Sequence, residues 1–117
     1  MTHCKRGEIV LVLYPDSNLR TAKRRPALVI QADNLNTGLR QTIVAMITSN
    51  MSRADHVSRV RLLLDSPAGQ KSGILMDSVV MTDNLATVHE NEIDRALGKL
   101  EDLAAIDAAI RQTLALN

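Results

Sequence analysis

The sequence predicts a mainly β fold: a small barrel or twisted sheet, with one helix at the C-terminal end packed against it. Short apolar segments rich in β-branched residues recur between residues 9 and 100, and turn-forming residues separate them. The clearest helical periodicity follows residue 102. The length of 117 residues suits one domain with a modest core, so we expect residues 1–117 to fold as a unit.

The first half of the chain predicts three strands. Residues 9–14, IVLVLY, form a continuous apolar run that is typical of a buried strand. A polar and basic loop is expected from there to Arg25. Residues 26–31 form the second predicted strand, with Pro26 at its first position, where a missing N–H is tolerated. Residues 42–48, TIVAMIT, form the third.

The second half predicts shorter and less regular strands. Residues 57–64 alternate partly between apolar and polar, as expected of a half-buried strand. Residues 65–69, DSPAG, predict a turn. Residues 74–76 and 78–81 suggest one or two further strands, with a break near Asp77. Weaker strand candidates follow at 86–88 and 93–100, and the second is also compatible with a helix.

The segment from Asp102 onward predicts an amphipathic helix. Its apolar stripe consists of Leu103, Ile106, Ala109, Ile110 and Leu114. Asp107 and Arg111 are expected to point away from that stripe. Acidic residues at the start of the segment would stabilise the helix, because they interact favourably with the positive end of its dipole.

The composition excludes several classes of protein. No apolar run approaches the 18 residues or so of a membrane span, so no membrane association is expected. The first residues lack the apolar stretch of a signal peptide. A single cysteine, Cys4, can form neither an internal disulfide nor a zinc site. These features favour a cytoplasmic protein.

The charges are unevenly distributed along the chain. Residues 1–61 carry ten Lys or Arg against four acids, whereas residues 62–117 carry four against nine. The densest basic run lies between Arg20 and Arg25. A basic half facing an acidic half suggests a surface for a polyanion on one side of the molecule.

The near absence of aromatic residues limits how a nucleic acid could be held. Tyr14 is the only aromatic side chain. Single-strand binders commonly stack bases on aromatic platforms. Any nucleic acid is therefore expected to be held mainly through its backbone charge and hydrogen bonds.

Two polar strand ends stand out as a possible phosphate site. Arg25 precedes Pro26, and a residue before proline favours extended backbone. The segment Thr48-Ser49-Asn50 ends the third predicted strand. An arginine fork beside a small hydroxyl can grip a phosphate, because the guanidinium stays charged at any physiological pH.

Five short motifs lie in order along the chain, between residues 6 and 88. They are Arg6-Gly7-Glu8-Ile9, Arg25-Pro26-Ala27-Leu28-Val29, Thr48-Ser49, Gly73-Ile74-Leu75-Met76-Asp77-Ser78-Val79-Val80 and Asp83-Asn84-Leu85-Ala86-Thr87-Val88. With the short apolar helix that follows, they resemble the MazF/PemK (Kid) family of toxin endoribonucleases.

That resemblance implies a fold, an activity and partners. The fold is an SH3-like small barrel (CcdB/PemK-like) with a C-terminal helix, usually a symmetric homodimer. Such toxins cut single-stranded RNA, often mRNA, at short sequences and without a metal or other cofactor. A cognate antitoxin (MazE/PemI-like) neutralises them by laying a segment over the RNA groove.

The resemblance also assigns site residues. It implies that Arg25 contacts the scissile phosphate and that Thr48 donates to a non-bridging oxygen. The further candidates for RNA contacts are Arg20, Lys23, Arg24, Ser49, His56 and Asp83. The general base stays open between His56, Glu8 and Asp83. The loop before Arg25 is more basic than the family pattern, and Ala86 stands where the family often has arginine.

Two other functions are compatible with the sequence. One is a non-enzymatic CcdB-like toxin that binds DNA gyrase, although those proteins end in Trp-Gly-Ile and this chain has no tryptophan. The other is an RNA-binding module that has lost catalysis. Retention of both Arg25 and Thr48 argues against that loss.

Overall fold

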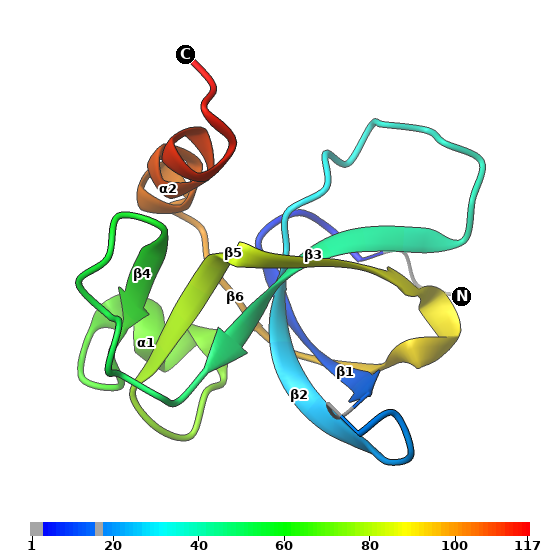
Figure 1. Ribbon diagram of the computed structural model, residues 1–117, viewed down its shortest axis with the longest axis horizontal. Helices are drawn as coiled ribbons and strands as arrows, with labels where there is room; N and C mark the ends of the chain where they lie inside the picture. Colours follow the sequence, from blue (N-terminus) through cyan, green and yellow to red (C-terminus); the bar gives the residue numbers. More distant parts are fainter. Residues whose placement is uncertain (1–3, 16–17) are drawn as a thin grey trace.

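The computed structural model describes residues 4–15 and 18–117, and six strands in them form one antiparallel sheet in the order β4-β5-β3-β2-β1-β6. Figure 1 shows this sheet strongly curved, with the C-terminal helix lying outside it. The elements are β1 (Glu8–Pro15), β2 (Ala22–Val29), β3 (Gln41–Thr48), β4 (Arg59–Leu62), α1 (Pro67–Ser72), β5 (Ser78–His89), the 3₁₀ helix η1 (Glu90–Glu92), β6 (Ile93–Lys99) and α2 (Ala104–Leu114). The prediction of a mainly β fold with a C-terminal helix is confirmed.

β2 begins earlier than the sequence predicts. It starts at Ala22, so Arg24 and Arg25 belong to the strand and not to the preceding loop. The reason is its partner: β1 pairs with β2 from Ile9–Leu28 through to Pro15–Ala22. A polar segment becomes a strand here because a neighbouring strand supplies the hydrogen bonds.

The second half of the sheet also differs from the prediction. β4 is shorter than the segment 57–64, and residues 74–76 form no strand. β5 is one long strand that joins the two segments 78–81 and 86–88. The segment 93–100, ambiguous in sequence, is strand β6, which pairs with β1.

The predicted turn at residues 65–69 begins a short helix, α1. Ser66 is its N-cap, since its Oγ accepts a hydrogen bond from Gly69 N–H at 2.9 Å, and Pro67 occupies the first turn. The serine and proline that suggested a turn are equally good helix starters, and the sequence alone did not distinguish the two.

The prediction of a small barrel or a twisted sheet is confirmed, in the form of one curved sheet that does not close on itself. β4 and β6 are its two edges in the described chain, and α1 lies between them. Two glycines allow this close fit: a Cβ at Gly69 would lie 1.8 Å from Leu63 O, and one at Gly73 would lie 2.1 Å from Leu97 O. A short helix therefore fills the gap that a closed barrel would bridge with hydrogen bonds.

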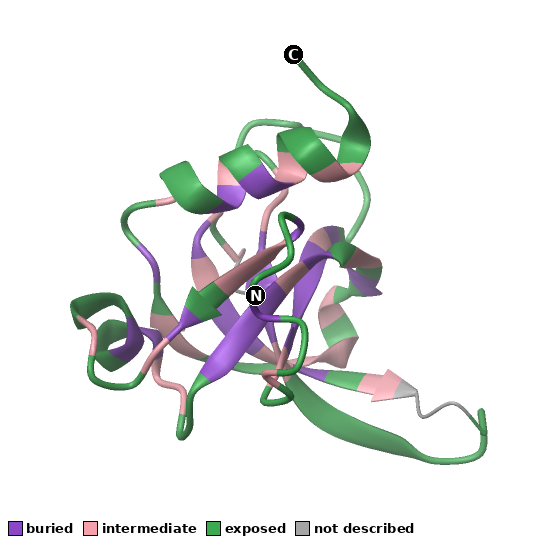
Figure 2. Ribbon diagram, turned by 60° about the vertical axis from the view of Figure 1, so that its left-hand side comes forward, coloured by how far each residue is buried: buried purple, intermediate pink, exposed green. Residues whose placement is uncertain are grey.

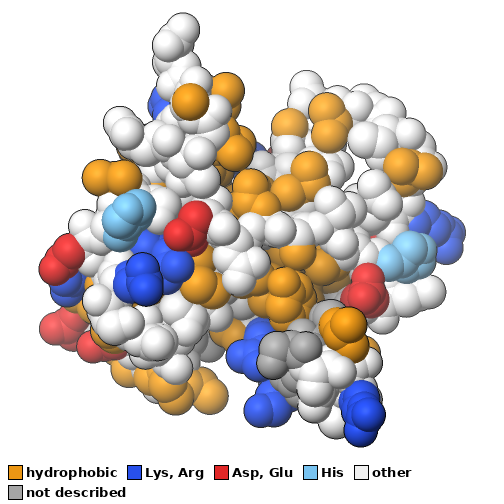
Figure 3. All heavy atoms as spheres, viewed as in Figure 1, with side chains coloured by type: hydrophobic (Ala, Val, Ile, Leu, Met, Phe, Trp, Pro, Cys, Tyr) orange, Lys and Arg blue, Asp and Glu red, His pale blue; other side chains and the backbone are white. Residues whose placement is uncertain are grey.

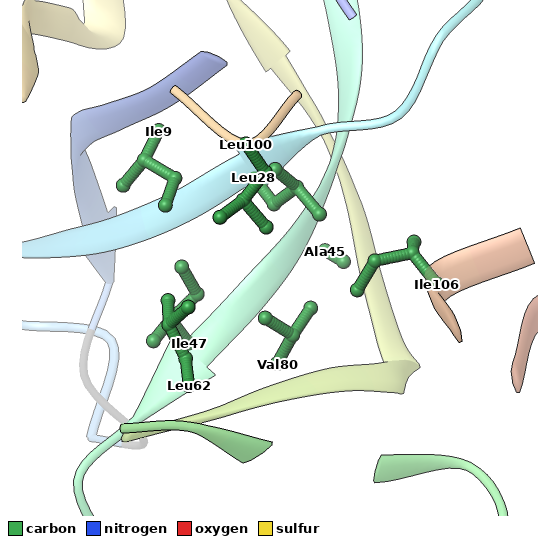
Figure 4. Close-up of a cluster of buried hydrophobic side chains, with 8 residues drawn as sticks. All are labelled: Ile9, Leu28, Ala45, Ile47, Leu62, Val80, Leu100 and Ile106. Atoms are coloured by element: carbon green, nitrogen blue, oxygen red, sulfur yellow. The ribbon is translucent and has the colours of Figure 1, made fainter. Parts of the chain in front are cut away.

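Both faces of the sheet are buried, which explains the continuous apolar runs. One cluster lies under α2 and contains Ile9, Leu28, Ala45, Ile47, Leu62, Val80, Leu100 and Ile106 (Figure 4). The other lies on the opposite face and contains Val10, Val12, Ala27, Val29, Val44, Met46 and Val88. Neighbouring residues of each strand alternate between the two clusters, as the two-residue period of a strand requires.

α2 covers the first cluster with one face. Figure 2 shows that the buried side of this helix lies toward the sheet. Ile106 and Ala109 are buried, whereas Leu114 is exposed. Asp107 does not point away as predicted: its carboxylate accepts a hydrogen bond from Arg6 Nη2. The segment before β1 thus ties α2 to the sheet. No described helix is long and apolar enough to cross a membrane.

Gly73 gives a direct test of the α1 insertion. We expect Gly73→Ala to lower the free energy of unfolding by at least about 2 kcal/mol, because the residue has φ +78° and its Cβ would overlap a backbone oxygen. Gly38→Ala is the matched control, since Gly38 has the same φ and nothing within 4 Å. Urea denaturation of both variants measures the difference, and equal losses would contradict the packing argument.

Candidate functional site

The sheet forks between β2 and β3. Their ladder pairs Ala27–Val29 with Val44–Met46. Beyond Ala27, β2 continues alongside β1 as far as Ala22, while β3 continues alongside β5 as far as Thr48. Two arms therefore diverge from the Ala27–Met46 pair, as Figure 1 shows. A groove lies between them.

Pro26 explains why the ladder ends at that point. Val29 O accepts a hydrogen bond from Gly7 N on the β1 side, and Ile30 N donates to Ile43 O on the β3 side. Backbone groups alternate between the two neighbours along an antiparallel strand, so the backbone of Pro26 faces β3. Proline has no N–H to donate there. Pro26 lies within β2, not at its start as predicted, and it ends the pairing with β3.

Arg25 and Thr48 face each other across the fork. Extending the β2–β3 register by two residues beyond Ala27–Met46 places them opposite one another. Arg25 is exposed and Thr48 is half-buried. Thr48 Oγ1 accepts a hydrogen bond from Asn50 N–H at 3.1 Å, which orients the hydroxyl and leaves its proton available for a second acceptor.

The groove continues the face of the second apolar cluster. It has a volume of about 640 Å³ and is lined by Tyr14, Asn18, Thr21, Lys23, Arg25, Met46, Ile47, Thr48, Met81 and Asn84. Figure 3 shows basic side chains around the β1–β2 hairpin beside an apolar strip on the same side of the molecule. A chain laid in this groove would meet positive charge at one wall and apolar surface at its floor.

Strand alternation divides the basic run of β2 between two faces. Lys23 and Arg25 lie on the groove face, with Lys23 paired across from Tyr14 of β1. Arg24 lies on the opposite face, where its Nε is 3.5 Å from an Asp94 carboxylate oxygen. Arg20 is exposed in the hairpin loop and does not line the groove. The sequence prediction did not separate these four cations.

A second, more apolar hollow adjoins the groove and shares Arg25 and Thr48 with it. It has a volume of about 490 Å³, and Ser49, Leu11, Leu75, Met76 and Leu97 are among its lining residues. Leu75 is 89% exposed and Met76 is 54% exposed. An apolar surface of this kind beside a site indicates a partner that covers it.

His56 and Asp83 lie outside the groove lining and belong to a network of their own. Asp83 accepts hydrogen bonds from Arg59 at 2.9 and 3.2 Å and from Ser58 Oγ at 3.1 Å. His56 Nδ1 lies 2.7 Å from Ser58 Oγ. Burial by itself would raise the pKa of Asp83, but the hydrogen bonds from Arg59 and then Ser58 outweigh it, so its pKa is lowered. A carboxylate held in this way is a poor general base.

Glu8, the third candidate for the general base, also lies elsewhere, as do the other titratable groups His89 and Cys4. The Glu8 carboxylate accepts from Lys5 N–H at the start of β1, and the His89 side chain caps η1. Burial, followed by the charges of Glu8 and Glu90, raises the pKa of the Cys4 thiol. No carboxylate or imidazole is among the described residues that line the groove. His3 lies outside the described residues.

The two halves of the sequence do not form separate charged faces. Arg6 pairs with Asp107, Arg24 with Asp94 and Arg59 with Asp83, so acids of the second half meet cations of the first. The basic surface is therefore narrower than the sequence predicts, and it is concentrated on the β1–β2 hairpin.

Known proteins match this chain along most of its length. A family model described as "PemK-like, MazF-like toxin of type II toxin-antitoxin system" matches residues 5–114. Endoribonuclease MazF6 of Mycobacterium tuberculosis (strain ATCC 25618 / H37Rv) is 34% identical over 102 residues, covering 78% of this chain and 90% of that protein. Endoribonuclease MazF2 of Mycobacterium bovis matches with the same identity and coverage.

The chain belongs to the MazF/PemK toxin family. Solved structures share the fold of this family member. An endoribonuclease in complex with its cognate antitoxin, from a mycobacterial species, has a TM-score of 0.73 at 19% identity and covers 98% of both chains. MazE-MazF from Deinococcus radiodurans has a TM-score of 0.73 at 16% identity and covers 100% of both chains.

Sequence reasoning missed several groove residues of this MazF/PemK chain, among them Met81 and Asn84. Both come from β5: Met81 pairs with Met46 of β3, and Asn84 lies in the irregularity that follows this pair. Asn84 lies within one of the motifs that carried the resemblance, so the motif pointed to the right segment. Only the register of β5 shows that Asn84, and not its neighbour Asp83, lines the groove.

The lowered pKa of Asp83 predicts a pH-dependent contribution to stability. A folded-state pKa below the unfolded value stabilises the fold above about pH 4, and this contribution is lost as the pH falls through the folded pKa. We expect Asp83→Asn to destabilise the chain at pH 7, because it weakens the Arg59–Asp83 ion pair. The loss should be only about 1 kcal/mol, since this pair is partly exposed. The difference from wild type should shrink below about pH 4.

Chemical denaturation between pH 7 and pH 3 measures that difference. Asp65→Asn is the control, since Asp65 is exposed and lies outside the network. A penalty for Asp83→Asn that is as large at pH 3 as at pH 7 would contradict the assignment of Arg59 and Ser58 as the cause.

Proposed function

We propose that this chain is the toxin of a type II toxin–antitoxin system, a sequence-selective endoribonuclease that cuts single-stranded mRNA in the cytoplasm without a metal. Residues 1–117 act as one toxin domain. The observation that carries the proposal is the position of Arg25 opposite Thr48 at the fork of the sheet. Membership of the MazF/PemK family and the endoribonuclease relatives support it.

The reaction needs no external nucleophile. The 2′-OH next to the scissile bond attacks the phosphorus and loses its proton, a new O–P bond forms, and the P–O5′ bond breaks. The leaving 5′ oxygen gains a proton, so the products carry a 2′,3′-cyclic phosphate and a 5′-OH. The negative charge of the transition state is concentrated on the non-bridging phosphate oxygens.

Arg25 and Thr48 act on that charge. The Arg25 guanidinium donates two parallel hydrogen bonds to phosphate oxygens, and the Thr48 hydroxyl donates a third. Asn50 N–H already holds the Thr48 oxygen, so the hydroxyl pays little ordering cost when it donates. Donors placed in advance at the site of developing charge lower the barrier electrostatically.

The wall of the hairpin holds the rest of the RNA. Lys23 binds a neighbouring phosphate, and Tyr14, which lines the same wall, offers a face to a base. Arg20 and Ser49 lie farther along the two arms and contact flanking nucleotides. His56, Asp83 and Arg24 have partners away from the groove, so we give them no direct role in the chemistry.

Two protein partners follow from the surface. A homodimer covers the exposed side chains of Leu75 and Met76 beside the site, because apolar surface next to a groove favours burial. A cognate antitoxin inserts an acidic segment into the basic groove and excludes RNA. Structural neighbours include an endoribonuclease solved with its cognate antitoxin and a MazE-MazF complex.

Cleavage of a long single-stranded RNA in EDTA tests the activity. We expect one short motif to be cut with 5′-OH ends, and Arg25→Ala and Thr48→Val each to slow cutting by roughly 10²–10³. Thr48→Ser keeps the hydroxyl and should retain most of the activity. Intact RNA with wild-type protein, together with DNA breaks in the presence of gyrase, would favour the CcdB-like alternative; RNA binding without cutting would favour the inactive module.

Salt dependence of RNA binding separates the two faces of β2. Arg25→Ala serves as the non-cleaving background. In it, Lys23→Gln should reduce the slope of log affinity against log salt by about 0.7, because one phosphate contact on a single strand is lost. Arg24→Gln, which removes the same charge one residue away on the opposite face, should leave the slope nearly unchanged. Equal effects from both variants would contradict the division of the two faces.

A further inference from the structure

β5 contains a bulge that faces the groove. β3 pairs Met46 with Met81 and Ala45 with Leu85, so Thr82, Asp83 and Asn84 are extra residues on β5. Bulges of this kind re-aim a side chain that regular pairing would place elsewhere. Here the bulge brings Asn84 into the lining of the groove, on the β5 arm beside Met81.

Arg59 and Ser58 hold the middle of the bulge. Arg59 of β4 donates to both carboxylate oxygens of Asp83, from Nε at 2.9 Å and from Nη2 at 3.2 Å. Ser58 Oγ donates to the same carboxylate at 3.1 Å. The Arg59 side chain is 15% exposed, so this ion pair is better shielded from water than an ordinary surface pair.

A second anchor holds the first residue of the bulge. Thr82 is fully buried, and both its N–H and its Oγ1 donate to Ser58 O, at 3.0 and 2.7 Å. Its Oγ1 also lies 2.8 Å from Thr113 Oγ1 of α2. Thr82 and Asp83 are therefore both fastened to the segment that leads into β4, and Asn84 projects from this fixed base. Figure 3 shows histidine, basic and acidic side chains together over β4 and β5.

We infer that Arg59 is a positioning residue for RNA: by holding Asp83 with its guanidinium fork, it fixes the β5 bulge and so places the Asn84 amide where a base of the RNA lies. This inference rests on the proposed function. An amide offers donors and an acceptor to a base edge, whereas Arg25 and Thr48 act on the phosphate. The bulge thus contributes to binding and sequence preference, and Arg25 and Thr48 at the fork contribute the chemistry.

Arg59→Ala, compared with Arg61→Ala, tests this inference. Arg61 lies two residues along the same strand and pairs with Asp55, away from the bulge. Arg61→Ala therefore deletes the same charge from β4 but leaves the bulge anchored. We expect Arg59→Ala to raise KM by about five- to tenfold, with kcat within about threefold, because a contact residue must be ordered on binding. The Arg59→Ala variant should also cut RNA at a wider range of sequences than the wild-type protein does. Arg61→Ala should change neither.

Asp83→Asn provides a second variant that keeps the shape of the side chain. It should raise KM as Arg59→Ala does, and the double variant should show no further increase, since both changes break one interaction. Arg59→Lys keeps the charge without the fork and should recover only part of the binding.

Amide hydrogen exchange of residues 82–85 in the absence of RNA gives an independent measurement. Exchange should be at least about tenfold faster in Arg59→Ala than in Arg61→Ala, because the bulge loses its anchor. Faster exchange with an unchanged KM would overturn the role in RNA binding, and a raised KM without faster exchange would show that Arg59 acts by its charge. If wild-type protein cuts no RNA, the proposed function fails, and RNA affinity on the same variants then decides the inference.

Discussion

The candidate site depends on a missing hydrogen-bond donor. The backbone of Pro26 faces β3 but has no N–H to donate. The β2–β3 ladder therefore stops at the adjacent pair, Ala27 and Met46. Each strand keeps its other neighbour, so both arms of the fork remain ordered while the space between them opens. The residues just beyond the last pair, Arg25 and Thr48, are consequently close in space, anchored by strands and open to solvent.

The fold tolerates this opening because its stability comes from elsewhere. Each hydrogen bond between two strands makes a net contribution of about 0.5–1.5 kcal/mol to stability, and backbone groups left unpaired at the fork can bond to water. A fully buried Val, Leu or Ile contributes about 1.5–3 kcal/mol, and both faces of the sheet carry a cluster of such residues. The two edge strands, β4 and β6, are covered by packing, since α1 fills the gap between them.

Arginine has three different uses in this chain, and the partner of each distinguishes them. Arg6 joins the N-terminal segment to α2 through Ile30 O and Asp107. Arg59 fastens a bulge through Asp83. Arg25 lies at the fork beside a hydroxyl and an apolar floor, where a phosphate can approach. Formal charge counted along the sequence gives all three the same weight, and only the groups beside each one in the fold reveal its role.

The sequence by itself determined the parts of this protein that depend on local pattern. The continuous runs in β1 and β3 predicted buried strands, the spacing of Ile106 and Ala109 predicted a helix, and the ordered motifs pointed to the family and to Arg25 and Thr48. Tertiary structure decided everything that needs a distant partner. β2 extends to Ala22 because β1 pairs with it, Asn84 lines the groove because β5 gains three residues against β3, and Asp83 turns to Arg59. Register, bulges and ion pairs are set by residues far away in sequence, and a local pattern carries no record of them.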